Sequence, residues 1–402
     1  MANRLASSLA SKWKLVQGQT FWKGMLGNPM DETLCQELIR YGQHIQCVVD
    51  GFNEVKASRW YGLCTHGKSQ LFHKLQMGNT GYTIHKYIYG STRDRPHLIT
   101  GTGTTREPHT GWSGYLAMSN DQESLRLGRR DILLAFRGME LSREWSEIDS
   151  LLPLPRLYPA KPAVAAGSSS PVLVSDHVAS LYTHCYPDEE FGRTCVRDQI
   201  VSTLRGLIDA NRDGEMSITV AGHSLGAALA TLCAYDIVNE SVNAAPNGKM
   251  IPVTVFAIGG PQVGNYALKV AAEGLQSLRV LTVVNPLDLV TKLPGNALGF
   301  VSHIGVLLEV VHTGLAYLKH KPEDIAVHDL QLYLHLIGNK VEPFKYHQLE
   351  LLNKSADLLV DPIVPPKWWY VRGVDVNVSV DEETGKVCFK LTNVSPSDPE
   401  YS

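Results

Sequence analysis

The chain has 402 residues, of which 44% are hydrophobic and 19% are charged, values close to those of an average globular protein. A chain of this length buries enough apolar surface to form a core without disulfides or metals. Its formal net charge of −3 gives no positive field of the kind that attracts nucleic acids or anionic lipids, and it argues against general disorder. We therefore expect a folded protein of mixed structure with no nucleic-acid partner.

Seven cysteines are scattered along the chain without a Cys-x-x-Cys pair, so zinc-ribbon and thioredoxin-like sites are not expected. An odd, unpatterned set is typical of a reducing compartment. No stretch approaches the roughly 20 apolar residues that a membrane-spanning helix needs. The start of the chain is rich in Ser and poor in acidic residues, as transit peptides are, but it is short and soon followed by Trp13. We expect residues 1–12 to be a short disordered N-terminus and the protein to be cytoplasmic.

The first half of the chain has a mixed pattern. Apolar residues at helical spacing predict a helix over 31–55, with Asp31 as its N-cap. Residues 58–120 contain short extended runs, and the apolar run 131–138 has the length of a buried strand and ends at a glycine. Residues 177–211 are predicted to form one long helix.

From residue 216 onward, predicted strands and helices alternate. The strands are expected at 216–222, 251–260 and 278–285, and the helices at 225–240, at 262–275 and around 328–337. Alternation at these lengths produces parallel β-α-β units, and hence a mostly parallel sheet with helices on both faces. The tail 374–393 alternates with period two around a turn-like Glu-Glu-Thr-Gly, which predicts a terminal hairpin.

The segment with the clearest chemistry is Gly222-His223-Ser224-Leu225-Gly226. A G-x-S-x-G sequence alone is weak evidence, but this one follows a predicted strand and opens a predicted helix, as a nucleophile elbow requires. Gly222 and Gly226 keep side chains out of a very tight turn, and the helix N-terminus favours negative charge beside Ser224. We interpret Ser224 as a nucleophile; the plain alternative is a glycine-containing turn with a buried serine.

A serine hydroxyl becomes nucleophilic when a base removes its proton and an acid orients that base. In α/β-hydrolases these partners follow in the order Ser, Asp, His. Asp288 stands just past the predicted strand 278–285 and is the candidate acid. Asp236 is the rival, but it lies well along the helix that follows Ser224 and would point away from the carboxyl edge of the sheet.

Six histidines follow the candidate acid: His303, His312, His320, His328, His335 and His347. His328 stands directly before a predicted helix and after a break at Pro322, which would leave its side chain free to reach Ser224. We therefore choose His328 as the base and interpret His335 as a packed or surface histidine. On this scheme His328 accepts the proton of Ser224 and passes it to the leaving alcohol, while Asp288 fixes its tautomer.

The developing oxyanion needs preorganised donors. One candidate is the backbone N–H of Leu225, the residue after the nucleophile. The second would come from the loop after the predicted strand 131–138, where Gly138 allows a close approach and the N–H of Met139 is the candidate. A plain glycine stop after a strand explains this loop equally well, and both interpretations stay open.

These segments resemble the class 3 lipases, and more narrowly the plant phospholipase A1 class II group. The resemblance covers nearly the whole chain and rests on motifs that occur in this order: WKGMLGNPMD, IRYGQHIQCVVDGFN, AFRGMELSREW, ITVAGHSLGAALATLCAYDIV, FAIGGPQVGN, VVNPLDLVTKLPG and HDLQLYLHLIG. The family's triad is the serine of the elbow, the aspartate of VVN-x-x-D and the histidine before L-x-x-Y-L-H. These positions fall on Ser224, Asp288 and His328. Related sequences usually carry Thr or Ser where this chain has Met139.

The resemblance implies an α/β-hydrolase fold over residues 13–363, followed by a C-terminal extension over 364–402. It also implies a serine acylhydrolase that cleaves the sn-1 acyl ester of phospholipids through an acyl-enzyme, with no metal or cofactor. The expected partners are a phospholipid or other glycerolipid and, transiently, a membrane surface; no protein partner is identified.

Two alternatives remain: a galactolipid or triacylglycerol lipase, and a catalytically weak lipase-like protein with a signalling or scaffold role. A lid over the site is expected for access to lipid, and residues 151–159 and 297–311 are candidates for it. An explanation of both segments as core or linker is equally good.

Overall fold

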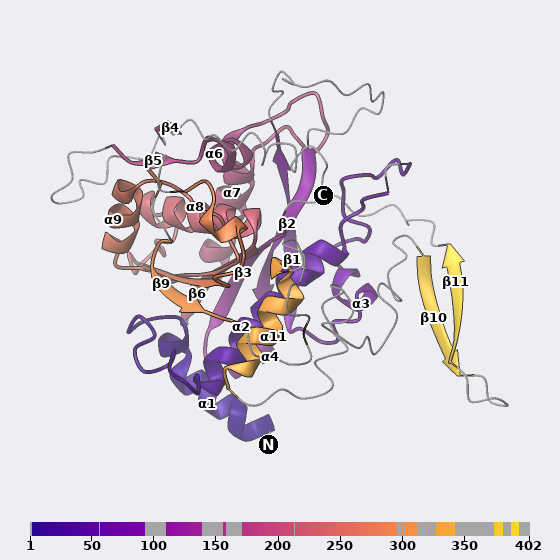
Figure 1. The fold of residues 1–402 in the computed structure, drawn as a ribbon, viewed down its shortest axis with the longest axis horizontal. Coiled ribbons are helices and arrows are strands. Elements are labelled where there is room, and N and C mark those ends of the chain that lie inside the picture. The colour runs from indigo at the N-terminus through magenta and orange to yellow at the C-terminus, as the bar shows by residue number, and fades with distance from the viewer. Residues whose placement is uncertain are drawn as a thin grey trace.

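A seven-stranded sheet forms the centre of the molecule, in the order β1-β2-β3-β6-β7-β8-β9 (Figure 1). The computed structural model describes residues 2–55, 57–92, 110–138, 156–157, 171–212, 214–295, 299–300, 303–311, 318, 327–341, 374–380 and 387–393. The strands of the sheet are β1 (Tyr82–Ser91), β2 (Thr110–Ser119), β3 (Arg130–Phe136), β6 (Met216–His223), β7 (Val253–Ile258), β8 (Leu278–Val284) and β9 (Val306–Glu309).

The sheet is parallel from β3 to β9, and β1 and β2 extend it in antiparallel fashion. The four strands predicted from apolar runs fall on β3, β6, β7 and β8. Each of them is buried along nearly its whole length, as expected for strands covered on both faces. The expectation of an α/β-hydrolase-like fold with a mostly parallel sheet is confirmed.

Helices cover both faces of this sheet, as Figure 1 shows. One apolar core lies beneath α2 (Glu32–Asp50) and α11 (Leu330–Asn339) and includes Ala221 of β6. The other lies beneath α6 (Asp176–Thr183), α7 (Val196–Ala210), α8 (Leu225–Asn239) and α9 (Tyr266–Gly274) and includes Val220. Neighbouring residues of a strand thus face opposite cores, as the pleat requires. The other helices of the described residues are α1 (Ala2–Val16), α3 (Leu71–Lys74), α4 (Asp121–Leu127) and the 3₁₀ turn η1 (Val290–Lys292).

The capping prediction for α2 is confirmed, because the side chain of Asp31 accepts hydrogen bonds from the N–H groups of Thr33 and Leu34. The expectation of a disordered N-terminus at residues 1–12 is wrong. Residues 2–16 form α1, and Leu9, Trp13 and Val16 are buried at a spacing of one helix face. Burial of this face stabilises the helix from Leu9 onward.

The single helix predicted over 177–211 is also wrong, since the segment folds as α6 and α7 with a loop between them. Pro187 falls in this loop, and proline interrupts a helix. The loop is closed by a hydrogen bond of 2.7 Å from the N–H of Tyr186 to the carbonyl of Gly192.

Near the C-terminus, β10 (Val374–Val380) and β11 (Val387–Asn393) pair in antiparallel fashion. The boundary expected between residues 363 and 364 lies outside the described residues and stays a prediction. Within the described part of the chain, no helix is both long and apolar enough to cross a membrane.

Candidate active site

Ser224 occupies the turn between β6 and α8 in a strained backbone conformation, with φ 57° and ψ −132°. The turn is held by close backbone contacts. A Cβ on Gly222 would lie 2.1 Å from the carbonyl oxygen of Gly226, and a Cβ on Gly226 would lie 2.2 Å from the carbonyl oxygen of Arg137. The N–H of Ser224 donates to the carbonyl of Ile258 at 3.0 Å. The two glycines are therefore needed for this turn, and the turn presents the Ser224 side chain at the carboxyl edge of the sheet.

The three residues chosen as nucleophile, base and acid form a line of hydrogen bonds. Nε2 of His328 lies 2.7 Å from Oγ of Ser224, and its Nδ1 lies 2.7 Å from Oδ2 of Asp288. All three side chains are buried. A carboxylate only accepts hydrogen bonds, so Nδ1 of His328 carries the proton and Nε2 is free to accept one from Ser224. The arrangement can therefore transfer the hydroxyl proton to the imidazole.

Asp288 has every donor that a buried carboxylate needs. Besides His328, its Oδ2 accepts a hydrogen bond of 2.7 Å from the hydroxyl of Tyr333, and its Oδ1 accepts one of 2.9 Å from the N–H of Val290. Tyr333 in turn accepts from the N–H of Asn285 at 3.0 Å. Burial and the charge of Asp288 raise the pKa of Tyr333 well above its usual value, so the phenol remains a donor.

The rival candidates lie elsewhere. Asp236 is buried on α8, where it accepts a hydrogen bond from Tyr182 and forms an ion pair of 2.8 Å with Arg197. These contacts connect α8 to α6 and α7 and give Asp236 a structural role. His335 is buried on α11, and burial lowers its pKa to about 4.

His223 is a further residue of the site, and the G-x-S-x-G motif does not predict its contact with the base. Its Nε2 lies 2.8 Å from the backbone carbonyl oxygen of His328, and the two rings have centroids 4.7 Å apart. The variable position of a G-x-S-x-G sequence carries no signal of such a contact. Tyr333 was equally unassigned, although it lies within the L-x-x-Y-L-H run that marks the base.

The loop after β3 lies directly beside the nucleophile. A Cβ on Gly138 would lie 3.0 Å from the Cβ of Ser224, so a residue with a side chain would have to displace its neighbours there. The guanidinium of Arg137 holds this loop by donating to the carbonyls of Trp112 and Gly138 at 2.6 and 2.7 Å. Leu225 is the first residue of α8, so its N–H has no acceptor within the helix. Met139 lies outside the described residues.

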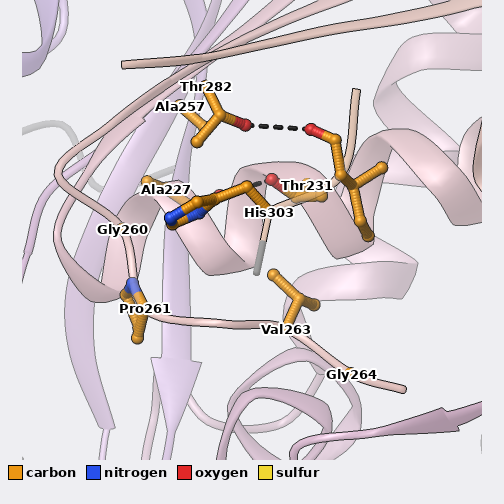
Figure 2. A pocket seen from close by; sticks show the side chains of 10 residues that line it. Ala227, Thr231, Ala257, Gly260, Pro261, Val263, Gly264, Thr282 and His303 are labelled. Atoms are coloured by element: carbon orange, nitrogen blue, oxygen red, sulfur yellow. Dashed lines mark hydrogen bonds between the residues drawn. The ribbon is translucent and has the colours of Figure 1, made fainter. Parts of the chain in front are cut away.

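A small hollow lies behind the first turns of α8, lined by Thr231, Thr282 and His303 among others (Figure 2). Thr231 donates to the carbonyl of Ala227 and Thr282 to that of Ile304, so both hydroxyl protons are already used. The volume of the hollow, about 20 Å³, is enough for one water molecule. The hollow is too small to hold an acyl chain.

Of the two segments considered as a lid, 151–159 lies outside the described residues except for Arg156–Leu157 (β4), which pairs with Leu173–Val174 (β5). The described part of 297–311 contains β9, which is the edge strand of the central sheet. That strand is part of the scaffold and not of a lid. Among the described side chains, no group of three or more His, Cys, Asp or Glu residues is placed to hold a metal ion.

Residues 133–298 match the family model described as Lipase (class 3), a range that contains Ser224 and Asp288. The chain is 33% identical to Phospholipase A1-Igamma1, chloroplastic, of Arabidopsis thaliana, over 90% of this chain and 75% of that protein. It is 30% identical to Phospholipase A1-IIalpha of the same plant, over 95% and 93% of the two chains.

The chain is also 34% identical to Galactolipase DONGLE, chloroplastic, of Arabidopsis thaliana, over 82% of this chain and 70% of that protein. Among solved structures, a lipase from Rhizopus microsporus var. chinensis is similar in structure. The match covers 70% of this chain and 75% of the lipase chain, with 20% sequence identity and a TM-score of 0.42.

Replacement of Gly226 by Ala tests the close contacts of the elbow. The added Cβ would lie 2.2 Å from the Arg137 carbonyl oxygen, so α8 or the loop after β3 must shift, and the proposed nucleophile with it. Because displacements of about 1 Å can cost about 10²-fold in rate, we expect kcat on a soluble short-chain ester to fall by about that factor.

Gly206→Ala is the matched control, because Gly206 lies inside α7 with no atom within 4 Å of an added Cβ. It should leave kcat unchanged and raise the free energy of unfolding by roughly 0.5–1 kcal/mol. Wild-type kcat in Gly226→Ala would show that the tight elbow is not needed for activity.

Proposed function

The chain belongs to the class 3 lipase family, alongside the plant phospholipases A1, and we propose that it hydrolyses the sn-1 acyl ester of phospholipids. Family membership makes it a carboxylic ester hydrolase. The observation that carries the proposal is the line of hydrogen bonds from Ser224 through His328 to Asp288, with both distances at 2.7 Å.

In the proposed reaction, Nε2 of His328 accepts the proton of Ser224 while Oγ attacks the acyl carbonyl carbon. Collapse of the tetrahedral intermediate breaks the ester bond, and the imidazolium returns its proton to the leaving alcohol of the lysophospholipid. A water molecule then attacks the acyl-enzyme with His328 as base, which releases the fatty acid and restores the Ser224 hydroxyl. Asp288 stabilises the imidazolium in both halves.

We assign the negative oxygen of each tetrahedral intermediate to the N–H of Leu225 and, as second donor, to that of Met139. The first assignment is supported by the position of Leu225 at the N-terminus of α8, where helical N–H groups lack acceptors. The second is supported by the contact between Gly138 and Ser224. No metal or cofactor enters this scheme.

The test uses phosphatidylcholine with different acyl chains at sn-1 and sn-2. We expect the sn-1 fatty acid and the 2-acyl lysophospholipid as products, and no release from Ser224→Ala, which lacks the attacking oxygen. Release of mainly the sn-2 acid by the wild-type chain would contradict the proposed regiochemistry.

A second substrate class is favoured by one specific finding, the 34% identity to a protein named galactolipase. The same triad would serve a galactolipid, because the ester is the same and only the head group differs. Hydrolysis of monogalactosyldiacylglycerol but not of phosphatidylcholine would favour this alternative, as hydrolysis of triacylglycerol alone would favour a neutral lipase. Absence of hydrolysis on all three would favour the scaffold interpretation.

We also propose that the chain docks transiently on a lipid surface, through an apolar rim formed by Leu287, Leu289 and Val311. Leu287 and Leu289 are 46% and 52% exposed and flank the buried Asp288. Val311, 44% exposed, follows Val310, whose N–H donates to the carbonyl of Val284 at the end of β8. All three residues therefore follow the carboxyl ends of the neighbouring strands β8 and β9, at the edge of the sheet that carries the triad.

Single exposed apolar residues are ordinary, but a group beside a catalytic site marks an interaction surface. A phosphatidylcholine bilayer fits this rim, because it offers apolar chains for the leucines and holds the ester that Ser224 would attack. The exposed Lys292 beyond Leu289 can contact the phosphate groups.

The double substitution Leu287→Ser and Leu289→Ser tests the rim in the Ser224→Ala background, where vesicles stay intact. We expect binding to phosphatidylcholine vesicles, measured by co-sedimentation, to fall about tenfold, because apolar side chains drive insertion into the interface.

Leu125→Ser is the control, because Leu125 is 80% exposed on α4, at the amino end of β3. It should bind vesicles like the parent. Equal binding by the double variant and its parent would exclude the rim as the docking surface.

We propose a cytoplasmic location. Its support is that six cysteines of the described residues are free thiols, as in a reducing compartment. Phospholipase A1-Igamma1 and Galactolipase DONGLE are named as chloroplastic, so the plastid is the competing location.

A further inference from the structure

His223 is the last residue of β6 and directly precedes Ser224, and its side chain contacts the proposed base. Its Nε2 is 2.8 Å from the backbone carbonyl oxygen of His328, and the two imidazole rings lie 4.7 Å apart with an interplanar angle of 32°. Both residues are buried, with exposed fractions of 8% and 6%. The contact joins two residues that lie 105 positions apart in the chain.

The direction of this hydrogen bond follows from its acceptor. A carbonyl oxygen only accepts, so Nε2 of His223 carries the proton and donates it. Burial and the neighbouring His328 hold the pKa of His223 well below its usual range, so the ring stays neutral. A neutral ring does not repel His328 when the latter becomes an imidazolium during the reaction.

The backbone of His328 needs such a contact because of its place in the fold. It precedes α11, whose N-cap Asp329 bonds to the N–H groups of Gln331 and Leu332. That cap fixes the start of the helix, and Asp288 fixes the orientation of the imidazole. Neither contact sets the distance between the His328 backbone and the elbow, whereas a bond from the residue next to Ser224 does.

We propose that His223 is a positioning residue, which ties the backbone of the base to the nucleophile elbow and so sets the distance between Nε2 of His328 and Oγ of Ser224. The proposal rests on the assignment of Ser224 and His328 as nucleophile and base. On this proposal, the residue directly before the nucleophile holds the base in place without contacting the substrate.

Two substitutions of equal length separate the hydrogen bond from the volume of the side chain. The amide nitrogen of His223→Gln can donate to the His328 carbonyl, whereas His223→Met cannot. On a soluble p-nitrophenyl ester we expect kcat of His223→Met to fall at least tenfold, with KM within about twofold, because a displaced base slows chemistry more than binding. His223→Gln should retain kcat within about threefold of wild type.

A third variant, His223→Phe, keeps a ring against His328 but loses the donor, and it should behave like His223→Met. Thermal unfolding of all three variants shows whether they fold. Equal loss of kcat in His223→Gln and His223→Met would overturn the proposal, as would wild-type kcat in His223→Met or in His223→Phe. Ser224→Ala on the same ester keeps the two questions separate: if it retained activity, the nucleophile assignment itself would fail, whatever the His223 variants do.

Discussion

The close backbone contact at the turn between β6 and α8 is the constraint on which the rest of the site depends. Gly222 and Gly226 approach neighbouring carbonyl oxygens so closely that a Cβ would lie 2.1 to 2.2 Å from them. This approach holds Ser224 at a positive φ, where a non-glycine residue is rarely found. The strain is maintained by the packing of α8 against β6 and β7, and it fixes one hydroxyl group at the carboxyl edge of the sheet.

The other groups of the site reach this hydroxyl from different segments of the chain. Asp288 follows β8, His328 precedes α11, and Gly138 follows β3, so parallel strands bring their carboxyl ends to one edge. Each group is held in turn by buried donors. Tyr333 and Val290 satisfy the carboxylate of Asp288, and His223 binds the backbone of the base. The geometry of the triad is thus a property of the packed sheet and not of one mobile loop.

The sequence predicted the parallel sheet because its central strands are continuous apolar runs of strand length, a pattern that local reading detects. Ser224 could be found from its pentapeptide and its place between a strand and a helix, and Asp288 and His328 from their order and surroundings. His223 and Tyr333 could not, because their partners lie 105 and 45 positions away and leave no local pattern. The helix at residues 2–16 does not follow from the Ser-rich composition of the segment; it follows from the helical spacing of Leu9, Trp13 and Val16, which are buried in the fold.

Reaction with a fluorophosphonate, followed by intact mass measurement and peptide mapping, tests whether Ser224 is the activated nucleophile. Such a reagent phosphonylates a serine whose proton is removed by an adjacent base. We expect one adduct per chain, located on Ser224, absent from Ser224→Ala and formed much more slowly in His328→Gln. No adduct on the wild-type chain, or an adduct that persists in Ser224→Ala, would contradict this assignment.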